Sequence, residues 1–162
     1  MKALVLTVSD RVSAGEAEDR SGPAAVARLA AAGFEADLEV IADGIGTVSA
    51  ALRTAIGGGV PLVVTTGGTG FGPRDLTPEG TAAVVDRPAP GLAEAMRAAT
   101  FGVNPHGMLS RGMAGIAGRT LIVNLPGSVA GVEESLEVIA PALRHAVELL
   151  RGAEGDHRPD HD

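Results

Sequence analysis

Short apolar runs of strand length alternate along this chain with segments of helical pattern. The apolar runs cover residues 3–8 (ALVLTV), 35–43 (EADLEVIAD) and 61–66 (PLVVTT), with two more at 112–118 and 119–125. The helical patterns cover residues 22–34, 47–56, 77–86, 91–101 and 128–150. Because helices that alternate with strongly apolar strands cover both faces of a sheet, the pattern predicts a three-layer α/β/α fold with a mostly parallel central sheet.

Several local signals refine this arrangement. Thr77 is expected to cap a helix that has Pro78 at its first position. The last helical segment contains Pro141, where the helix could break. Residues 9–22 are polar and contain glycine, so we expect a loop there. The two late apolar runs meet at Gly118 and could add an antiparallel element.

Length and composition limit the class of protein. The chain has 162 residues and a net charge of −7, which argues against a nucleic-acid-binding surface. It has no cysteine, so a thiolate nucleophile and a zinc–thiolate site are excluded. No apolar stretch approaches the roughly 20 residues of a membrane helix. We expect one domain over residues 1–152, a disordered polar tail over 153–162, and a soluble cytoplasmic protein without membrane contacts.

Polar residues follow the predicted strands at the point where each strand ends. In an open α/β sheet the carboxyl ends of the strands form the ligand-binding edge. The first strand delivers Ser9 and Asp10 to this edge, and the second delivers Asp43. The third strand leads into residues 65–75, and the last leads into residues 124–128. The sequence therefore predicts a single binding edge built from all four strand ends.

The segment TTGGTGFGPRD, residues 65–75, is the most unusual of these strand ends. Four glycines fall between Gly67 and Gly72. The loop has neither the lysine of a P-loop nor the third glycine of a dinucleotide fingerprint. Glycines let backbone amides approach an anion closely, and the helix expected at Thr77 adds a favourable dipole. We predict that Gly67, Gly68 and Gly70 hold a phosphate-bearing ligand, although a tight strand-to-helix connection is the alternative.

Two carboxylates accompany the predicted phosphate cradle. Asp43 and Asp75 come from neighbouring strand ends, and together they would suit one Mg²⁺ that also contacts phosphate oxygens. Asp43-Gly44 and Pro126-Gly127 are also common turn pairs, so a purely structural role stays open for both segments. His106 is expected to be a loop residue and not a base.

The motifs in this order resemble the MoaB/Mog family of molybdenum-cofactor biosynthesis, which includes the G domain of gephyrin. The resemblance rests on VSDRVSAGEAEDRSGP, on TTGGTGFGPRDLTPE, on the LSR of residues 109–111 and on NLPGS, and it extends from about residue 4 to residue 150. It implies a three-layer α/β fold. The second acidic segment reads ADG around Asp43, so a further acidic residue that is common in the family is replaced by Gly44.

The resemblance also implies an activity and its residues. Active members use Mg²⁺ and ATP to adenylylate molybdopterin, with release of pyrophosphate. The family's two essential acidic residues correspond to Asp43 and Asp75. Its pterin and nucleotide loops correspond to a larger set of positions. These are Gly67, Gly68, Thr69, Gly70, Ser110, Asn124, Pro126, Gly127 and Ser128, to which we add Ser9, Asp10 and Arg74 as candidate substrate-binding residues.

The resemblance finally implies partners. Family members usually form homotrimers, and pairing of trimers into hexamers stays open, as does contact with a protein that inserts molybdate. A different function is also compatible with the sequence: a non-catalytic homologue that binds molybdopterin or serves as a scaffold. The presence of Asp43, and of Asp75 directly after Arg74, favours the enzyme.

Overall fold

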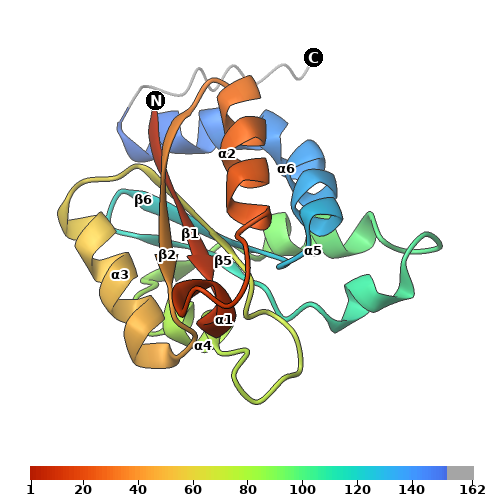
Figure 1. Ribbon diagram of the computed structural model, residues 1–162. Coiled ribbons are helices and arrows are strands. Elements are labelled where there is room, and N and C mark those ends of the chain that lie inside the picture. Colours follow the sequence, from red (N-terminus) through yellow and green to blue (C-terminus); the bar gives the residue numbers. More distant parts are fainter. Residues whose placement is uncertain (153–162) are drawn as a thin grey trace.

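A computed structural model describes residues 1–152 as a six-stranded sheet between two layers of helices (Figure 1). The strand order is β2-β1-β3-β6-β5-β4. The strands are β1 (Lys2–Val8), β2 (Glu35–Ile41), β3 (Leu62–Thr66), β4 (Arg87–Pro88), β5 (Ala114–Ala117) and β6 (Thr120–Leu125). The first four strands in this order are parallel, whereas β5 is antiparallel to both β6 and β4. The predicted mostly parallel sheet and the antiparallel pair around Gly118 are therefore confirmed.

The helices divide between the two faces of the sheet. They are α1 (Asp10–Ser13), α2 (Ser21–Ala31), α3 (Ile45–Gly57), α4 (Thr77–Ala82), α5 (Pro90–Ala98) and α6 (Val129–Leu150), with a short 3₁₀ helix, η1 (Pro105–Leu109). One buried cluster joins the sheet to α2, α5 and α6, and the other joins it to α3. Neighbouring residues Val63 and Val64 of β3 belong to different clusters because side chains alternate across a strand. The apolar strands thus fill two cores and produce the predicted three layers.

The register of the parallel strands places their carboxyl ends side by side. Val8 pairs with Ile41, Thr7 pairs with Thr66, and Thr66 pairs with Leu125. The residues that follow these pairs therefore leave the sheet at one edge, as the sequence predicted. No helix within residues 1–152 is long and apolar enough to cross a membrane. The predicted tail, residues 153–162, lies outside the described residues.

Two local predictions were wrong, and the structure settles a third point that the sequence left open. The polar segment after β1 is not entirely a loop, because Ser9 caps α1 by accepting a hydrogen bond from the amide of Val12 at 3.2 Å. Thr77 is not a cap. It is the first residue of α4, and its hydroxyl donates to the carbonyl of Gly67 at 2.9 Å. The helix α6 continues through Pro141, since buried side chains on both sides of the proline hold it against the sheet.

Candidate functional site

The glycine loop between β3 and α4 makes close contacts that only glycine permits. Gly67 and Gly68 adopt positive φ angles of 93° and 64°. A Cβ atom at Gly67 would overlap the carbonyl oxygen of Val8, and one at Gly68 would overlap the hydroxyl of Thr77. The loop is thereby pressed against the end of β1 and the start of α4. These close contacts are with the protein itself, as the alternative of a tight strand-to-helix connection requires, and the predicted binding of phosphate stays a prediction.

The loop after β6 is packed directly against the glycine loop. The amide of Gly67 donates to the carbonyl of Leu125 at 3.2 Å, and a Cβ atom at Gly127 would lie 3.2 Å from the Cα of Gly67. Ser128 caps α6 through the amide of Gly131, at 3.1 Å. The two strand ends therefore form one continuous backbone surface.

Asn124 supports this surface from within the protein. Its side chain is buried, and its amide nitrogen donates to the hydroxyls of Thr65 at 3.0 Å and Thr81 at 2.9 Å. Its amide oxygen accepts from the amide of Met113 at 3.2 Å. Because these partners occupy the side chain, Asn124 fixes the ends of β3 and β6 to α4 and does not reach a cavity.

Asp10 and Arg74 order the backbone around Asp43. The amide of Asp10 donates to Oδ2 of Asp43 at 2.8 Å, and the amide of Asp43 donates to Oδ1 of Asp10 at 3.0 Å. Arg74 then donates to both carboxylate oxygens of Asp10, at 2.9 and 3.1 Å, and to the carbonyl of Asp43 at 2.9 Å. In this structure the guanidinium of Arg74 is engaged by the protein itself and lines neither of the two cavities at this edge.

Asp75 lies beneath the far half of the glycine loop. Its Oδ2 accepts from the amide of Gly72 at 2.8 Å, which closes a tight turn. A Cβ atom at Gly70 or Gly72 would lie 2.9 or 2.8 Å from the same oxygen. Asp75 is thus held against the loop by one oxygen, while no protein donor within residues 1–152 binds the other.

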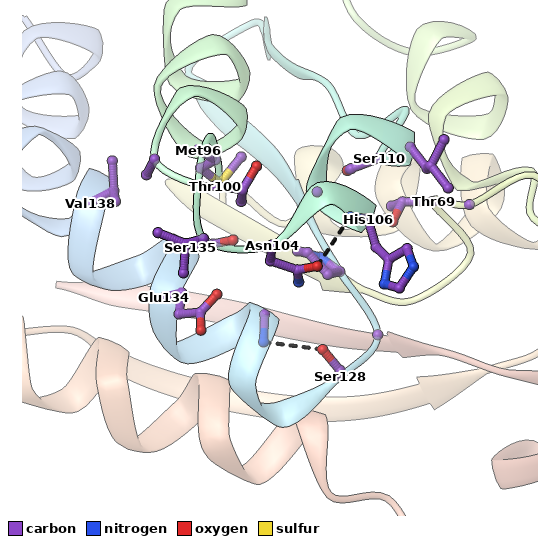
Figure 2. A pocket seen from close by; sticks show the side chains of 18 of the residues that line it. Thr69, Met96, Thr100, Asn104, His106, Ser110, Ser128, Glu134, Ser135 and Val138 are labelled. Carbon is purple, nitrogen blue, oxygen red and sulfur yellow. Dashed lines mark hydrogen bonds between the residues drawn. The ribbon is translucent and has the colours of Figure 1, made fainter.

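Two cavities meet at these loops. The smaller, of about 480 Å³, lies between the ends of β1, β2 and β3, and the larger, of about 820 Å³, extends toward α5, η1 and α6 (Figure 2). Of the predicted residues, Ser9, Asp43 and Gly67 line only the smaller one. Another four line only the larger one, namely Thr69, Gly70, Ser110 and Pro126. Both cavities are lined by Gly68, Asp75, Gly127 and Ser128, which form their common wall.

The carboxylates of this edge influence one another electrostatically. Partial burial raises the pKa of Asp43 above its ordinary value, and the nearby charges of Asp10 and Asp75 act in the same direction. The hydrogen bond from Arg74 lowers the pKa of Asp10. The protein therefore compensates the negative charge of Asp43 less well than that of Asp10.

The donor set fits a hard divalent cation that shares its coordination with a ligand. Oδ1 of Asp43 faces Gly68, and within residues 1–152 no protein donor binds it. The described residues hold no cluster of three or more metal-binding side chains. Two carboxylates with free oxygens beside a loop of backbone amides suit Mg²⁺, which takes few protein ligands and completes its shell with phosphate and water.

Comparison with known proteins assigns the family. Residues 4–145 match the family described as a probable molybdopterin binding domain. The chain belongs to this family. It is 39% identical over 152 residues to the molybdopterin adenylyltransferase of Helicobacter pylori, covering 91% of this chain and 86% of that protein. The structure of MoaB from Thermus thermophilus is 45% identical, with a TM-score of 0.88 over 93% of this chain and 96% of that one.

Some relatives are much longer than this chain. Gephyrin of Dictyostelium discoideum is 39% identical over 167 residues, which cover 96% of this chain but 23% of that protein. The chain also spans about half the length of two curated bifunctional proteins of molybdenum cofactor biosynthesis. The same domain therefore occurs both nearly alone and as part of larger chains.

Several residues of the site were not singled out by sequence reasoning. Asp19 lines the smaller cavity and accepts from the hydroxyl of Thr7 at 2.7 Å and from the amide of Gly22 at 2.9 Å. The larger cavity is also lined by Asn104, which caps η1, and by Glu134 and Ser135 of α6 (Figure 2). His106, which was expected in a loop, lies in η1 and lines the same cavity. The signal available for Asp19 was its place two residues before the Ser-Gly-Pro start of α2, whereas Asn104, Glu134 and Ser135 carried no distinctive pattern.

Proposed function

We propose that this molybdopterin-binding domain transfers the adenylyl group of ATP to molybdopterin. The observation that carries the proposal is the common wall of the two cavities. Gly68, Asp75, Gly127 and Ser128 stand where two ligands, one in each cavity, would bring their phosphates together. Similarity to a molybdopterin adenylyltransferase over most of both chains supports the same conclusion.

The reaction needs positioning more than it needs a protein nucleophile. An oxygen of the molybdopterin phosphate forms a bond to the α-phosphorus of ATP, and the bond from that phosphorus to the β-phosphate oxygen breaks, so pyrophosphate leaves. Gly68 lies in the common wall, where its backbone amide would approach a phosphate closely, and Ser128 would add a hydroxyl there. Holding both phosphates at one wall converts the encounter of two substrates into an intramolecular step.

Asp43 and Asp75 would hold Mg²⁺, which supplies compensation for the negative charge that develops on the transferred group. The raised pKa of Asp43, caused first by burial and then by its acidic neighbours, is consistent with this role. Asp10 and Arg74 fix the backbone that carries Asp43, and the turn at Gly72 fixes Asp75. The chain thus contributes two oriented carboxylates, and each is held by a different set of hydrogen bonds.

The proposal includes the setting of the reaction. We propose a cytoplasmic homotrimer, with hexamers as the alternative assembly, that passes adenylylated molybdopterin to a protein that inserts molybdate. Size-exclusion chromatography with light scattering measures the assembly directly, and a stable monomer would contradict it.

The test measures transfer of AMP from ATP to purified molybdopterin in the presence of Mg²⁺. The release of pyrophosphate is the readout. We compare the wild type with Asp75→Asn and with Asp86→Asn. Asp86 is a matched control because its carboxylate also accepts a backbone amide at 2.8 Å, from Gly118, but lies outside both cavities. If the proposal is right, pyrophosphate release depends on added pterin, is lost in Asp75→Asn and is retained in Asp86→Asn. Tight pterin binding without pyrophosphate release would instead support a non-catalytic binding domain.

A further inference from the structure

Arg111 connects the whole glycine loop to α4. Its backbone amide donates to the carbonyl of Thr69 at 2.8 Å, and its Nε donates to the carbonyl of Gly70 at 2.9 Å. Its Nη2 donates to the carbonyl of Asp75, and its Nη1 pairs with the carboxylate of Glu79 in α4. Three carbonyls of one loop therefore face a single residue that comes from the segment before β5.

This arrangement fixes the direction of two backbone amides. In a trans peptide the N–H points opposite to the C=O of the same unit, and no peptide bond in residues 1–152 is cis. Because the carbonyls of Thr69 and Gly70 face Arg111, the amides of Gly70 and Phe71 point away from it. Within residues 1–152 neither amide donates to a protein acceptor, and both residues line the larger cavity. Successive amides turned to one side form an anion-binding nest.

We infer that Arg111 is a positioning residue that holds the amides of Gly70 and Phe71 ready to bind a phosphate oxygen in the larger cavity. The inference rests on the proposed function for its ligand class, since both substrates carry phosphate. It does not involve a metal. Arginine suits the task because its planar fork reaches several acceptors at fixed angles, whereas a lysine ammonium is a single point of contact.

The contact with Glu79 orients the guanidinium. The Glu79 carboxylate accepts from Nη1 and, at 3.4 Å, from Nη2, so the far side of the fork is anchored to α4. The near side, formed by Nε and Nη2, remains directed at the loop carbonyls of Gly70 and Asp75. We call the contacts of Arg111 with the carbonyls of Thr69, Gly70 and Asp75 the clamp. Glu79→Gln should weaken the clamp less than a change at Arg111 itself.

A purely structural role for Arg111 makes a different prediction. If Arg111 only joined the loop to α4, its replacement would lower Tm without a specific effect on anion binding. The distinguishing measurement is binding of inorganic pyrophosphate without added metal, by calorimetry and by amide NMR shifts. We compare the wild type, Arg111→Lys and Arg53→Lys, because Arg53 also donates to a backbone carbonyl, that of Ala83 at 3.2 Å, but lies outside the site.

Pyrophosphate should shift the amide signals of Gly70 and Phe71 in the wild type and in Arg53→Lys. In Arg111→Lys the affinity should fall about tenfold or more, as expected when preorganised charge-oriented donors are lost. Unmoved Gly70 and Phe71 signals in the wild type, or an unchanged affinity in folded Arg111→Lys, would overturn the inference. If Arg111→Lys does not fold, Glu79→Gln replaces it, and a pyrophosphate affinity equal to that of the wild type would likewise count against the clamp.

The outcomes separate this inference from the proposed function. If pyrophosphate shifts the amide NMR signals only when Arg111 is present, but the protein shows no adenylyl transfer, the result supports the clamp and contradicts the proposed enzyme activity. If the protein transfers the adenylyl group, but its affinity for pyrophosphate does not depend on Arg111, the result supports the enzyme activity and contradicts the clamp.

Discussion

Asp10 and Asp43 bind each other reciprocally, each accepting the other's backbone amide with its carboxylate, at 2.8 and 3.0 Å. The two residues follow neighbouring parallel strands, so this exchange joins the ends of β1 and β2 directly at the predicted metal site. Arg74 completes the unit from the glycine loop. The position of the Asp43 carboxylate is therefore determined by residues from three strand ends.

Asp10→Ala should reduce adenylyl transfer although Asp10 lines neither cavity. The change removes the acceptor for the Asp43 amide and the partner of Arg74, so both would lose their fixed orientation. Loss of residues that orient metal ligands typically costs about 10–100-fold in activity or metal affinity. The measurement is kcat/KM as a function of Mg²⁺ concentration. Asp37→Ala is the control, because Asp37 lies within strand β2 and does not line the smaller cavity. Equal Mg²⁺ dependence of Asp10→Ala and the wild type would contradict the prediction.

Gly68→Ala should impair both folding and activity. At a φ of 64°, an added Cβ atom would overlap the Thr77 hydroxyl, which itself holds the carbonyl of Gly67. We expect a loss of about 1–3 kcal/mol in the free energy of unfolding from the strained backbone and its contacts. Urea denaturation measures this loss. Gly46→Ala in α3 is the control, since nothing lies within 4 Å of the added atom, and it should stay within about 0.5 kcal/mol of the wild type. Similar stabilities for the two variants would refute the close-contact argument.

Asn124→Ala should be strongly destabilising because its partners are buried. The hydroxyls of Thr65 and Thr81 would lose a donor, and the amide of Met113 would lose an acceptor. Leaving such groups unsatisfied costs about 1–3 kcal/mol each, reduced where the hydroxyls find new partners. Calorimetry should show a decrease in Tm of several degrees, about 2–4 °C for each kcal/mol in a domain of this size. Asn104→Ala removes a single exposed contact with the amide of His106 and should change Tm little. A small effect at Asn124 would show that water replaces its bonds.

The sequence predicted the fold where apolar periodicity is strong. Strands β1, β3 and β6 are buried along almost their whole length, and this left few alternatives for their placement. The exposed strand β4 has two residues and η1 has five, so neither carries enough pattern to be recognised. The helix around Pro141 was uncertain because local rules oppose it, and the buried face of α6 decides the outcome.

The sequence predicted which strand ends meet, but only part of the contacts between them. The strand ends were expected at one edge of the sheet, where the register places them, and the density of glycine indicated an unusual backbone at Gly67 and Gly68. The side-chain contacts of Arg111 join residues 32 to 41 positions apart, and those between Arg74 and Asp10 span 64 positions. Such pairings depend on how the loops meet in space, so no local sequence pattern predicts them.

Asp43 should reduce the stability of the native state at neutral pH. Burial, together with the charges of Asp10 and Asp75, raises its pKa, so the folded chain holds this proton more tightly than the unfolded chain does. The contribution of Asp43 to stability is therefore fully present below its unfolded pKa of about 3.8 and is lost as pH rises through the folded value. We expect Asp43→Asn to unfold at a higher urea concentration than the wild type at pH 7, while adenylyl transfer is lost.

The gain should disappear at about pH 3, where both forms of residue 43 are neutral. The measurement is the difference in unfolding free energy between Asp43→Asn and the wild type across this pH range. Asp10, whose pKa Arg74 lowers, has the opposite pH dependence. Because Asp10 is hydrogen-bonded to residue 43, the measured difference includes the coupling between the two residues. Asp86→Asn controls for removal of a carboxylate elsewhere. If Asp43→Asn were less stable than the wild type at pH 7, or if its gain did not vary with pH, the Asp43 carboxylate would not be the under-compensated charge that a bound cation relieves.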